Sequence, residues 1–122
     1  MRIKHYDQIL EPLETPSGEV IYELVGRGEG VEPIPNHSLA RIVIPRGKSS
    51  SAHFHKLSQE TYYILEGEGR MTVDGETHTL HPGQACLIEP EEVHQIANHG
   101  VYDLVFLAVC VPAWDPDDTY EV

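Results

Sequence analysis

The sequence predicts an all-β domain, an antiparallel sandwich or barrel, and two observations lead to this class. Apolar and polar residues alternate over short runs, whereas a helical period is almost absent along the chain. Glycine, proline and Asp-Gly turn signals interrupt these runs at roughly eight-residue intervals, which is typical of short strands joined by tight turns. The 122 residues are the length of one domain and can bury a single core.

In chain order, strands are expected in residues 19–26 (EVIYELVG), 38–45 (SLARIVIP), 61–67 (TYYILEG), 70–73 and 76–80 (RMTVDGETHTL with its turn), 84–88 (QACLI), 94–98 (HQIAN) and 102–111 (YDLVFLAVCV). The clearest hairpin is centred on Asp74-Gly75, because this pair suits a type I′ turn. The stretch WDPDDTY indicates one helical turn, with Asp115 as N-cap and Pro116 at the first helical position.

The composition excludes several classes of partner. The chain has 20 acidic residues against 8 Lys and Arg, a net charge of −12, so its surface repels nucleic acid and anionic lipid. The first residues do not resemble a signal peptide, and the longest apolar stretch, residues 104–111, is strand-sized, so a cytoplasmic location is the default. Cys86 and Cys110 lack CxxC spacing and are interpreted as packing residues rather than a disulfide.

A cluster of polar side chains is expected on one face of the sheet. His53 and His55 are two residues apart, so in a strand both imidazoles point to the same side. Glu60 opens the next strand after a short connection, and His94 follows a tight corner at the start of another alternating run. Three imidazole nitrogens and one carboxylate oxygen are a donor set that suits a divalent transition metal.

These residues also carry a resemblance to the cupin family. Its first motif is met by Gly47, His53, His55, Glu60 and Gly67 at the family's spacings, and its second by Gly83, His94 and Asn98. The chain departs from the second motif at Glu89, where the family has proline, and at Glu91, where it has glycine. The resemblance implies a double-stranded β-helix, the cupin or jelly-roll barrel, with His53, His55, Glu60 and His94 as ligands of one divalent ion, either Mn, Fe, Ni, Co or Zn.

The resemblance also implies an organisation for the chain. The barrel is expected over residues 38–112, and residues 113–122 form a C-terminal tail with the short helical turn. Residues 1–37 form an extension with edge strands, and we expect this segment to pair across a two-fold axis in a homodimer. The run ETYYILEGEGRMTVDGE looks most similar to cupins near phosphomannose isomerase.

Four protein ligands leave two neighbouring positions on an octahedral ion for a small molecule with adjacent oxygens. The favoured function is Lewis-acid catalysis, an isomerisation or decarboxylation of a sugar-derived or organic acid substrate. An Fe(II)-dependent dioxygenase and a non-catalytic module that binds a small molecule or metal are the alternatives. Tyr62 shares the face of Glu60 and is the nearest candidate for a general base; Asp103 is a second candidate, with a solvated strand end as its alternative interpretation.

Overall fold

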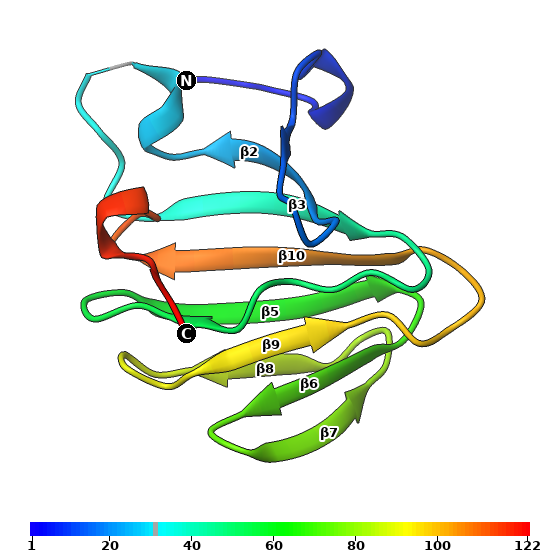
Figure 1. Ribbon diagram of the computed structural model, residues 1–122. Helices are drawn as coiled ribbons and strands as arrows, with labels where there is room; N and C mark the ends of the chain where they lie inside the picture. Colours follow the sequence, from blue (N-terminus) through cyan, green and yellow to red (C-terminus); the bar gives the residue numbers. More distant parts are fainter. Residues whose placement is uncertain (31) are drawn as a thin grey trace.

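The segments in which apolar and polar residues alternate form strands, and these strands build two antiparallel sheets (Figure 1). The computed structural model describes residues 1–30 and 32–122, so Val31, inside the expected N-terminal extension, lies outside the described residues. Within these ranges, the larger sheet has six strands in the order β1-β2-β3-β10-β5-β8, and the smaller sheet has five in the order β11-β4-β9-β6-β7. The all-β class with antiparallel pairing is therefore confirmed.

The larger sheet consists of β1 (Leu13–Glu14), β2 (Val20–Val25), β3 (Ser38–Ile44), β10 (Leu104–Val111), β5 (Gln59–Glu66) and β8 (Ala85–Ile88). The smaller sheet consists of β11 (Tyr120–Glu121), β4 (His53–Phe54), β9 (His94–Ala97), β6 (Gly69–Val73) and β7 (Glu76–Leu80). Three 3-10 turns lie outside the sheets: η1 (Tyr6–Gln8), η2 (Arg27–Glu29) and η3 (Pro116–Asp118). No helix of the described residues has the length and apolar character that crossing a membrane requires.

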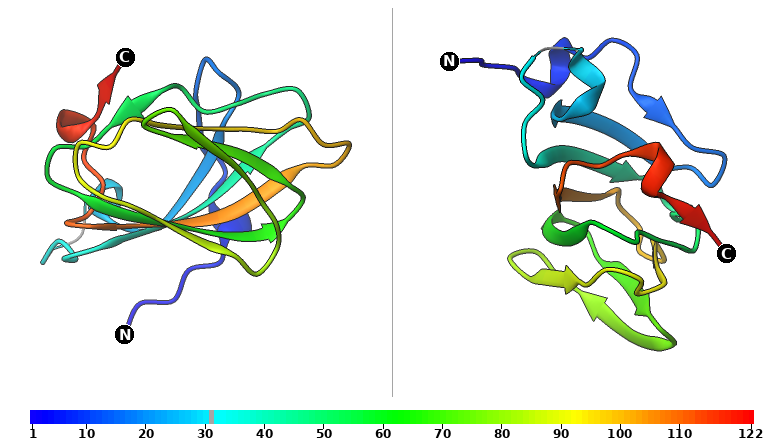
Figure 2. Two further views of the ribbon diagram at one scale, coloured as in Figure 1. Left: turned by 90° about the horizontal axis from the view of Figure 1, so that it is seen from below. Right: turned by 90° about the vertical axis from the view of Figure 1, so that its left-hand side faces the viewer.

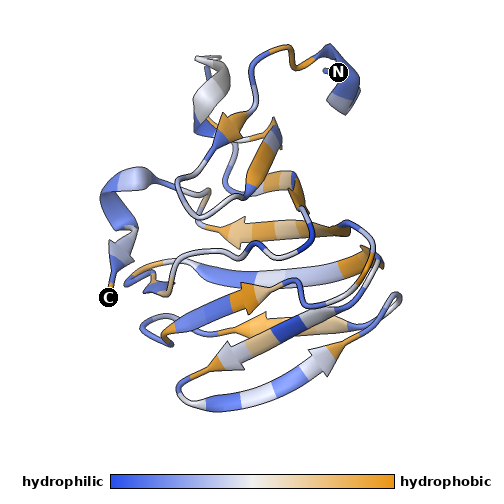
Figure 3. Cartoon of the chain, turned by 45° about the vertical axis from the view of Figure 1, so that its right-hand side comes forward, coloured by the Kyte–Doolittle hydropathy of each residue, from blue (hydrophilic) through white to orange (hydrophobic). Residues whose placement is uncertain are grey.

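The core lies between the sheets, and β5 shows how alternation builds it. Glu60, Tyr62 and Ile64 are buried, whereas the side chains between them are not. The ring of Phe106 on β10 packs 4.6 Å from the ring of Tyr62, measured between centroids. Figure 3 shows the apolar residues concentrated on β2, β3 and β10, while β7 at the opposite edge is mostly hydrophilic. Each large apolar side chain buried between the sheets contributes about 1.5–3 kcal/mol, so this core is the main source of stability.

Two turns explain residue choices that the sequence already indicated. The predicted hairpin is confirmed, because Val73 of β6 pairs with Glu76 of β7 and the turn residues Asp74 and Gly75 have φ of 46° and 84°. Gly67 directly follows β5 with φ of 78°, and a Cβ there would lie 2.5 Å from the backbone oxygen of Asp103. Only glycine permits this close approach between the end of β5 and the start of β10.

Asn98, the last residue of the second motif, joins three segments. Its buried amide donates hydrogen bonds to the carbonyls of Ile44 (2.9 Å) and Tyr102 (2.8 Å) and accepts one from the N–H of Gly100 (2.9 Å). These contacts fix the end of β3 against the loop between β9 and β10. The motif asparagine therefore supports the barrel.

The two ends of the chain cover different parts of the sheets (Figure 2). In the N-terminal segment, the Arg41 guanidinium lies 4.0 Å from the centre of the Tyr6 ring, and the rings of Tyr6 and Tyr22 are 5.9 Å apart. These two contacts hold η1 against β2 and β3. At the C-terminus, Asp115 caps η3, and β11 then pairs with β4. This pairing brings the tail beside His53.

Candidate metal centre

Four buried side chains from separate parts of the barrel meet in its interior. β4 and β9 are adjacent strands, and His53 lies directly opposite His94, with 4.2 Å between the ring centroids. His55 follows β4 on the same face, and Glu60 reaches the group from β5 in the larger sheet. One donor atom from each of the four lies within 4.8 Å of the others, a grouping that could hold a metal ion.

The three histidines share one hydrogen-bonding pattern, which fixes how their rings point. Each Nδ1 lies at hydrogen-bond distance from a backbone carbonyl: His53 from Ser51 (2.9 Å), His55 from Asp118 (3.0 Å) and His94 from Glu92 (3.0 Å). A carbonyl accepts and cannot donate, so the proton of each neutral ring resides on Nδ1. The lone pair of each Nε2 is then available for a metal, as in sites where an outer hydrogen bond orients a ligating imidazole.

Glu60 is oriented in the same way. The Sγ–H of Cys110 donates to its Oε2 at 3.1 Å, which leaves Oε1 facing His94 Nε2 at 3.2 Å and His55 Nε2 at 3.4 Å. Both cysteines are free thiols, as predicted, and Cys110 in addition positions the carboxylate. No sequence pattern indicates that role, because it depends on the pairing of Glu60 with Cys110 across β5 and β10.

The donor set fits a divalent ion. Oε1 of Glu60 and Nε2 of His55 and His94 are buried, and among the described residues they have no hydrogen-bond partner. Each unpartnered buried polar atom costs about 1–3 kcal/mol, and a cation in their midst would satisfy all of them at once. Three imidazole nitrogens with one carboxylate oxygen are ligands that transition metals prefer.

The electrostatics favour the ligand forms of His53 and Glu60 and act in the opposite direction on His55. Burial, and then the neighbouring His94, lower the pKa of His53 to about 4. Burial opposes the charge of Glu60, but its close contacts with His55 and His94 outweigh this effect and lower the pKa of the carboxyl to about 2. Burial also acts against protonated His55, yet its contacts with Glu60 raise its pKa. Glu60 is thus a carboxylate at neutral pH.

Asp118 is a supporting residue that the sequence analysis missed. Its buried carboxylate accepts hydrogen bonds from the backbone N–H groups of Lys56, Leu57 and Ser58 at 3.0–3.2 Å, and its carbonyl holds the ring of His55. It therefore fixes the loop that joins His55 to Glu60. The sequence showed Asp118 only as an acidic residue in a helical turn, because its partners lie some 60 positions away.

Glu91 fills the position where the second motif has glycine. Its φ is 71°, a left-handed value that a residue with a Cβ adopts at a cost. Its backbone N–H donates to the carbonyl of His55 at 2.6 Å, so the corner before His94 keeps its tight geometry. The departure from the motif changes the strain in the turn, and the structure still places His94 in the cluster.

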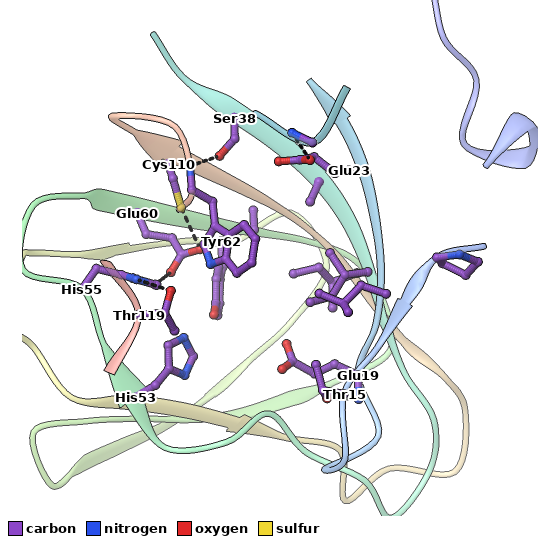
Figure 4. Close-up of a pocket in the computed structure, with 18 of the residues that line it drawn as sticks. Thr15, Glu19, Glu23, Ser38, His53, His55, Glu60, Tyr62, Cys110 and Thr119 are labelled. Carbon is purple, nitrogen blue, oxygen red and sulfur yellow. Dashed lines mark hydrogen bonds and ion pairs between the residues drawn. The ribbon is translucent and has the colours of Figure 1, made fainter. Parts of the chain in front are cut away.

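His53, His55 and Glu60 of the cluster line a cavity of about 400 Å³ (Figure 4). Tyr62 lines it and its ring lies 6.0 Å from the ring of His94, so the structure brings this residue to the site. Burial first, and then the charge of Glu60, raise the pKa of the Tyr62 hydroxyl well above its usual value, which makes it a poor base at neutral pH. Asp103 is exposed in the loop before β10 and does not line the cavity.

Glu19 is the second residue that the sequence analysis missed. It precedes β2, is 7% exposed and points its carboxylate into the cavity (Figure 4). Burial, and then the charge of Glu60, raise its pKa to about 7, while His94 acts in the opposite direction. In the sequence Glu19 is one acid among 20, and its place in the interior depends on the pairing of β2 with β3.

Comparison with known proteins agrees with this geometry. An uncharacterised protein of Methanocaldococcus jannaschii is 37% identical over 116 residues, which cover 93% of this chain and 89% of the relative. The oxalate-binding protein of Thermotoga maritima is 40% identical over 72 residues, 59% of this chain and 60% of the relative. The crystal structure of a predicted oxalate decarboxylase from Thermotoga maritima superimposes with a TM-score of 0.77 at 28% identity, covering 91% of this chain and 99% of that one.

The family model of the Cupin domain matches residues 40–110, which contain both motifs and all four residues of the cluster. This match spans more than half of the chain, and the barrel of two antiparallel sheets is the fold that the motifs implied. The expected double-stranded β-helix is thereby confirmed, and the chain belongs to the cupin family.

Proposed function

We propose that this protein is a metal-dependent enzyme that acts on a small oxygenated molecule bound between the cluster and the cavity. The single observation that supports this proposal is the convergence of four oriented donor atoms beside a cavity, three of them buried and without a hydrogen-bond partner among the described residues. The ligands in this proposal are His53, His55, Glu60 and His94. A bound divalent ion would supply Lewis-acid polarisation of a substrate carbonyl.

The lining of the cavity indicates which substrates suit it. Among the described residues that line it are five carboxylates, Glu11, Glu19, Glu23, Glu60 and Glu121, against a single basic side chain other than histidine, Lys4. Such a lining disfavours a multiply charged anion. The remaining wall is apolar and includes Ile21, Ile42 and Trp114. We therefore favour a neutral sugar-derived or hydroxy-carbonyl compound, with its oxygens at the cluster and its carbon skeleton along this wall.

Metal uptake provides the first test. Protein purified without added metal is analysed for bound elements, stripped with chelator and titrated with Mn, Fe, Ni, Co and Zn while thermal unfolding is followed. An ion at about a hundred times its dissociation constant is expected to raise the unfolding free energy by about 2.7 kcal/mol. His94→Ala should lose this response, whereas His78→Ala, which removes an exposed imidazole on β7, should keep it. A wild-type protein that takes up none of these ions refutes the proposal.

Two other functions are distinguished by a second measurement. The same donors would hold Fe(II) for a dioxygenase, and the name of the Thermotoga maritima oxalate-binding protein favours a non-catalytic module. The metal-loaded protein is incubated in D₂O with a panel of hydroxyketones and catechols. Deuterium incorporation into the compound without oxygen uptake supports Lewis-acid catalysis, whereas oxygen uptake by the Fe(II) form supports a dioxygenase. Binding without either reaction supports the module.

A homodimer is also part of the proposal. The N-terminal segment carries exposed apolar side chains at Ile3 (87% exposed), Leu10 (89%) and Leu13 (51%), and β1 is the outer strand of the larger sheet. A second copy could cover both this edge and these side chains. Sedimentation at micromolar concentration is expected to give twice the mass of the chain, and removal of residues 1–12 should give a monomer. A monomeric full-length protein contradicts this assembly.

A further inference from the structure

Glu19 lies in the cavity, and no contact among the described residues stabilises its carboxylate. Its backbone is fixed, because its N–H donates to Thr15 Oγ1 at 3.1 Å and its carbonyl accepts from the N–H of Thr15 at 2.9 Å. Its side chain is different: the carboxylate accepts no hydrogen bond and forms no ion pair with the described residues. A buried carboxyl group with no partner destabilises a fold, so packing alone does not account for it.

The position of Glu19 relative to the cluster gives it a chemical role. Glu19 comes from the start of β2, while Glu60, His53 and His55 come from the other side of the cavity, so a small molecule at the cluster would lie between them (Figure 4). The charges of Glu60 and His94 both influence the Glu19 carboxyl. At neutral pH both its protonated and its ionised forms are accessible, because burial raises its pKa to about 7.

Other titratable groups around the cavity are less suited to proton transfer. Tyr62 holds its proton tightly, and Cys110 is engaged with Glu60. Glu60 and the three histidines are assigned to the metal. The remaining charged groups of the described lining are Lys4, Glu11, Glu23 and Glu121. Of these carboxylates, Glu11 and Glu121 are exposed, and Glu23 accepts a hydrogen bond from the N–H of Gly28.

We propose that Glu19 is the proton-transferring residue of this site, acting on a substrate whose oxygens bind at the cluster. In an isomerisation, the C–H bond beside the substrate carbonyl breaks and its proton forms an O–H bond with a Glu19 oxygen. The electron pair of that bond becomes a carbon–carbon double bond, and the carbonyl π pair moves to oxygen. The proton then returns to the former carbonyl carbon, while the proton of the neighbouring hydroxyl passes to the former carbonyl oxygen and that hydroxyl oxygen becomes the new carbonyl. The Glu19 carboxylate is restored, so no oxidant or further reactant is needed. This inference rests on the proposed function.

Proton counting tests the role without requiring turnover. Acetohydroxamic acid is a small neutral probe that chelates metal ions through two adjacent oxygens and loses one proton when it does so. Its binding to the Zn²⁺-loaded protein is measured by calorimetry at about pH 8, in buffers of different ionisation enthalpy, which gives the number of protons released. Wild-type protein is expected to release about one proton fewer than Glu19→Gln, because Glu19 takes up the proton of the probe.

Glu11→Gln provides the matched control, since it removes an exposed carboxylate from the same cavity lining, and it should release as many protons as the wild type. Equal proton release by wild type and Glu19→Gln overturns the role of Glu19 and leaves the metal site standing. Absence of probe binding in all three proteins overturns the proposed function as well. Carbon-13 NMR of glutamate carboxyl groups in the wild type avoids any folding defect of the variant: the Glu19 signal should shift to its protonated position on probe binding, and an unchanged signal refutes the proposal.

Discussion

The stability of the metal-free protein should depend on pH through Glu19. The pKa of this carboxyl is about 7 in the folded protein, against an ordinary value of 4.5. The folded protein therefore binds the proton more tightly than the unfolded chain does. The contribution is fully present below about pH 4.5 and is lost as the pH rises towards 7. The total loss is roughly 3 kcal/mol, at about 1.4 kcal/mol for each unit of pKa.

The perturbation is Glu19→Gln, which keeps the size of the side chain and removes its ionisation. Urea unfolding of chelator-treated protein is followed at several values between about pH 5 and about pH 8. Over this range the variant is expected to gain about 2.5 kcal/mol of stability relative to the wild type, because only the wild type must bury a charged carboxylate.

The comparison between the two proteins also removes the effect of His53. Burial and His94 lower the pKa of His53 from 6.5 to about 4. The contribution of His53 to stability therefore increases as the pH rises from about 4 to 6.5, whereas that of Glu19 decreases with pH. This term is present in both proteins and cancels. Glu11→Gln should run parallel to the wild type, since an exposed side chain loses little hydration on folding. A constant difference between wild type and Glu19→Gln across the range refutes the reasoning.

Two further predictions concern the support of the cluster. Asp118→Ala should destabilise the fold by about 2–4 kcal/mol in urea unfolding and weaken metal binding about 10–100-fold in a competition titration. Three backbone N–H groups, that of Ser58 buried, lose their acceptor, and the loop after His55 loosens. Unchanged metal affinity would show that Asp118 is not needed to hold His55. Glu91→Gly should stabilise the protein by about 0.5–1 kcal/mol. Glycine removes the strain of the left-handed conformation, and the greater entropy of the unfolded chain offsets part of this stabilisation. A lower melting temperature of the variant would contradict the prediction.

The local pattern of the sequence was sufficient to predict several features of the barrel. Alternation placed His53 and His55 on one face, and the Asp74-Gly75 pair marked a hairpin that the structure contains. These predictions succeed because the side-chain period of a strand and the φ values of a turn depend on residues close together in the chain. Motif spacing added Glu60 and His94, which the structure brings to the same point.

Residues whose roles depend on distant partners were not accessible in this way. Asp103 was a candidate base on the parity of its strand, yet β10 begins at Leu104 and Asp103 remains exposed. Tyr62 reaches the cavity, but burial raises the pKa of its hydroxyl, which therefore keeps its proton at neutral pH. Desolvation is set by atoms from several strands, so the chemical usefulness of a side chain cannot be read from its neighbours in sequence.

The sequence by itself determined the β architecture, the cupin motifs and the set of residues offered to a metal, because each of these follows from short-range periodicity or fixed spacing. Only the tertiary structure decided which ring nitrogens face inward, that Asp118 and Cys110 support His55 and Glu60, and that Glu19 stands unpartnered across the cavity. The physical reason is that hydrogen bonds and burial join residues far apart in the chain, and these exist only once the two sheets have come together.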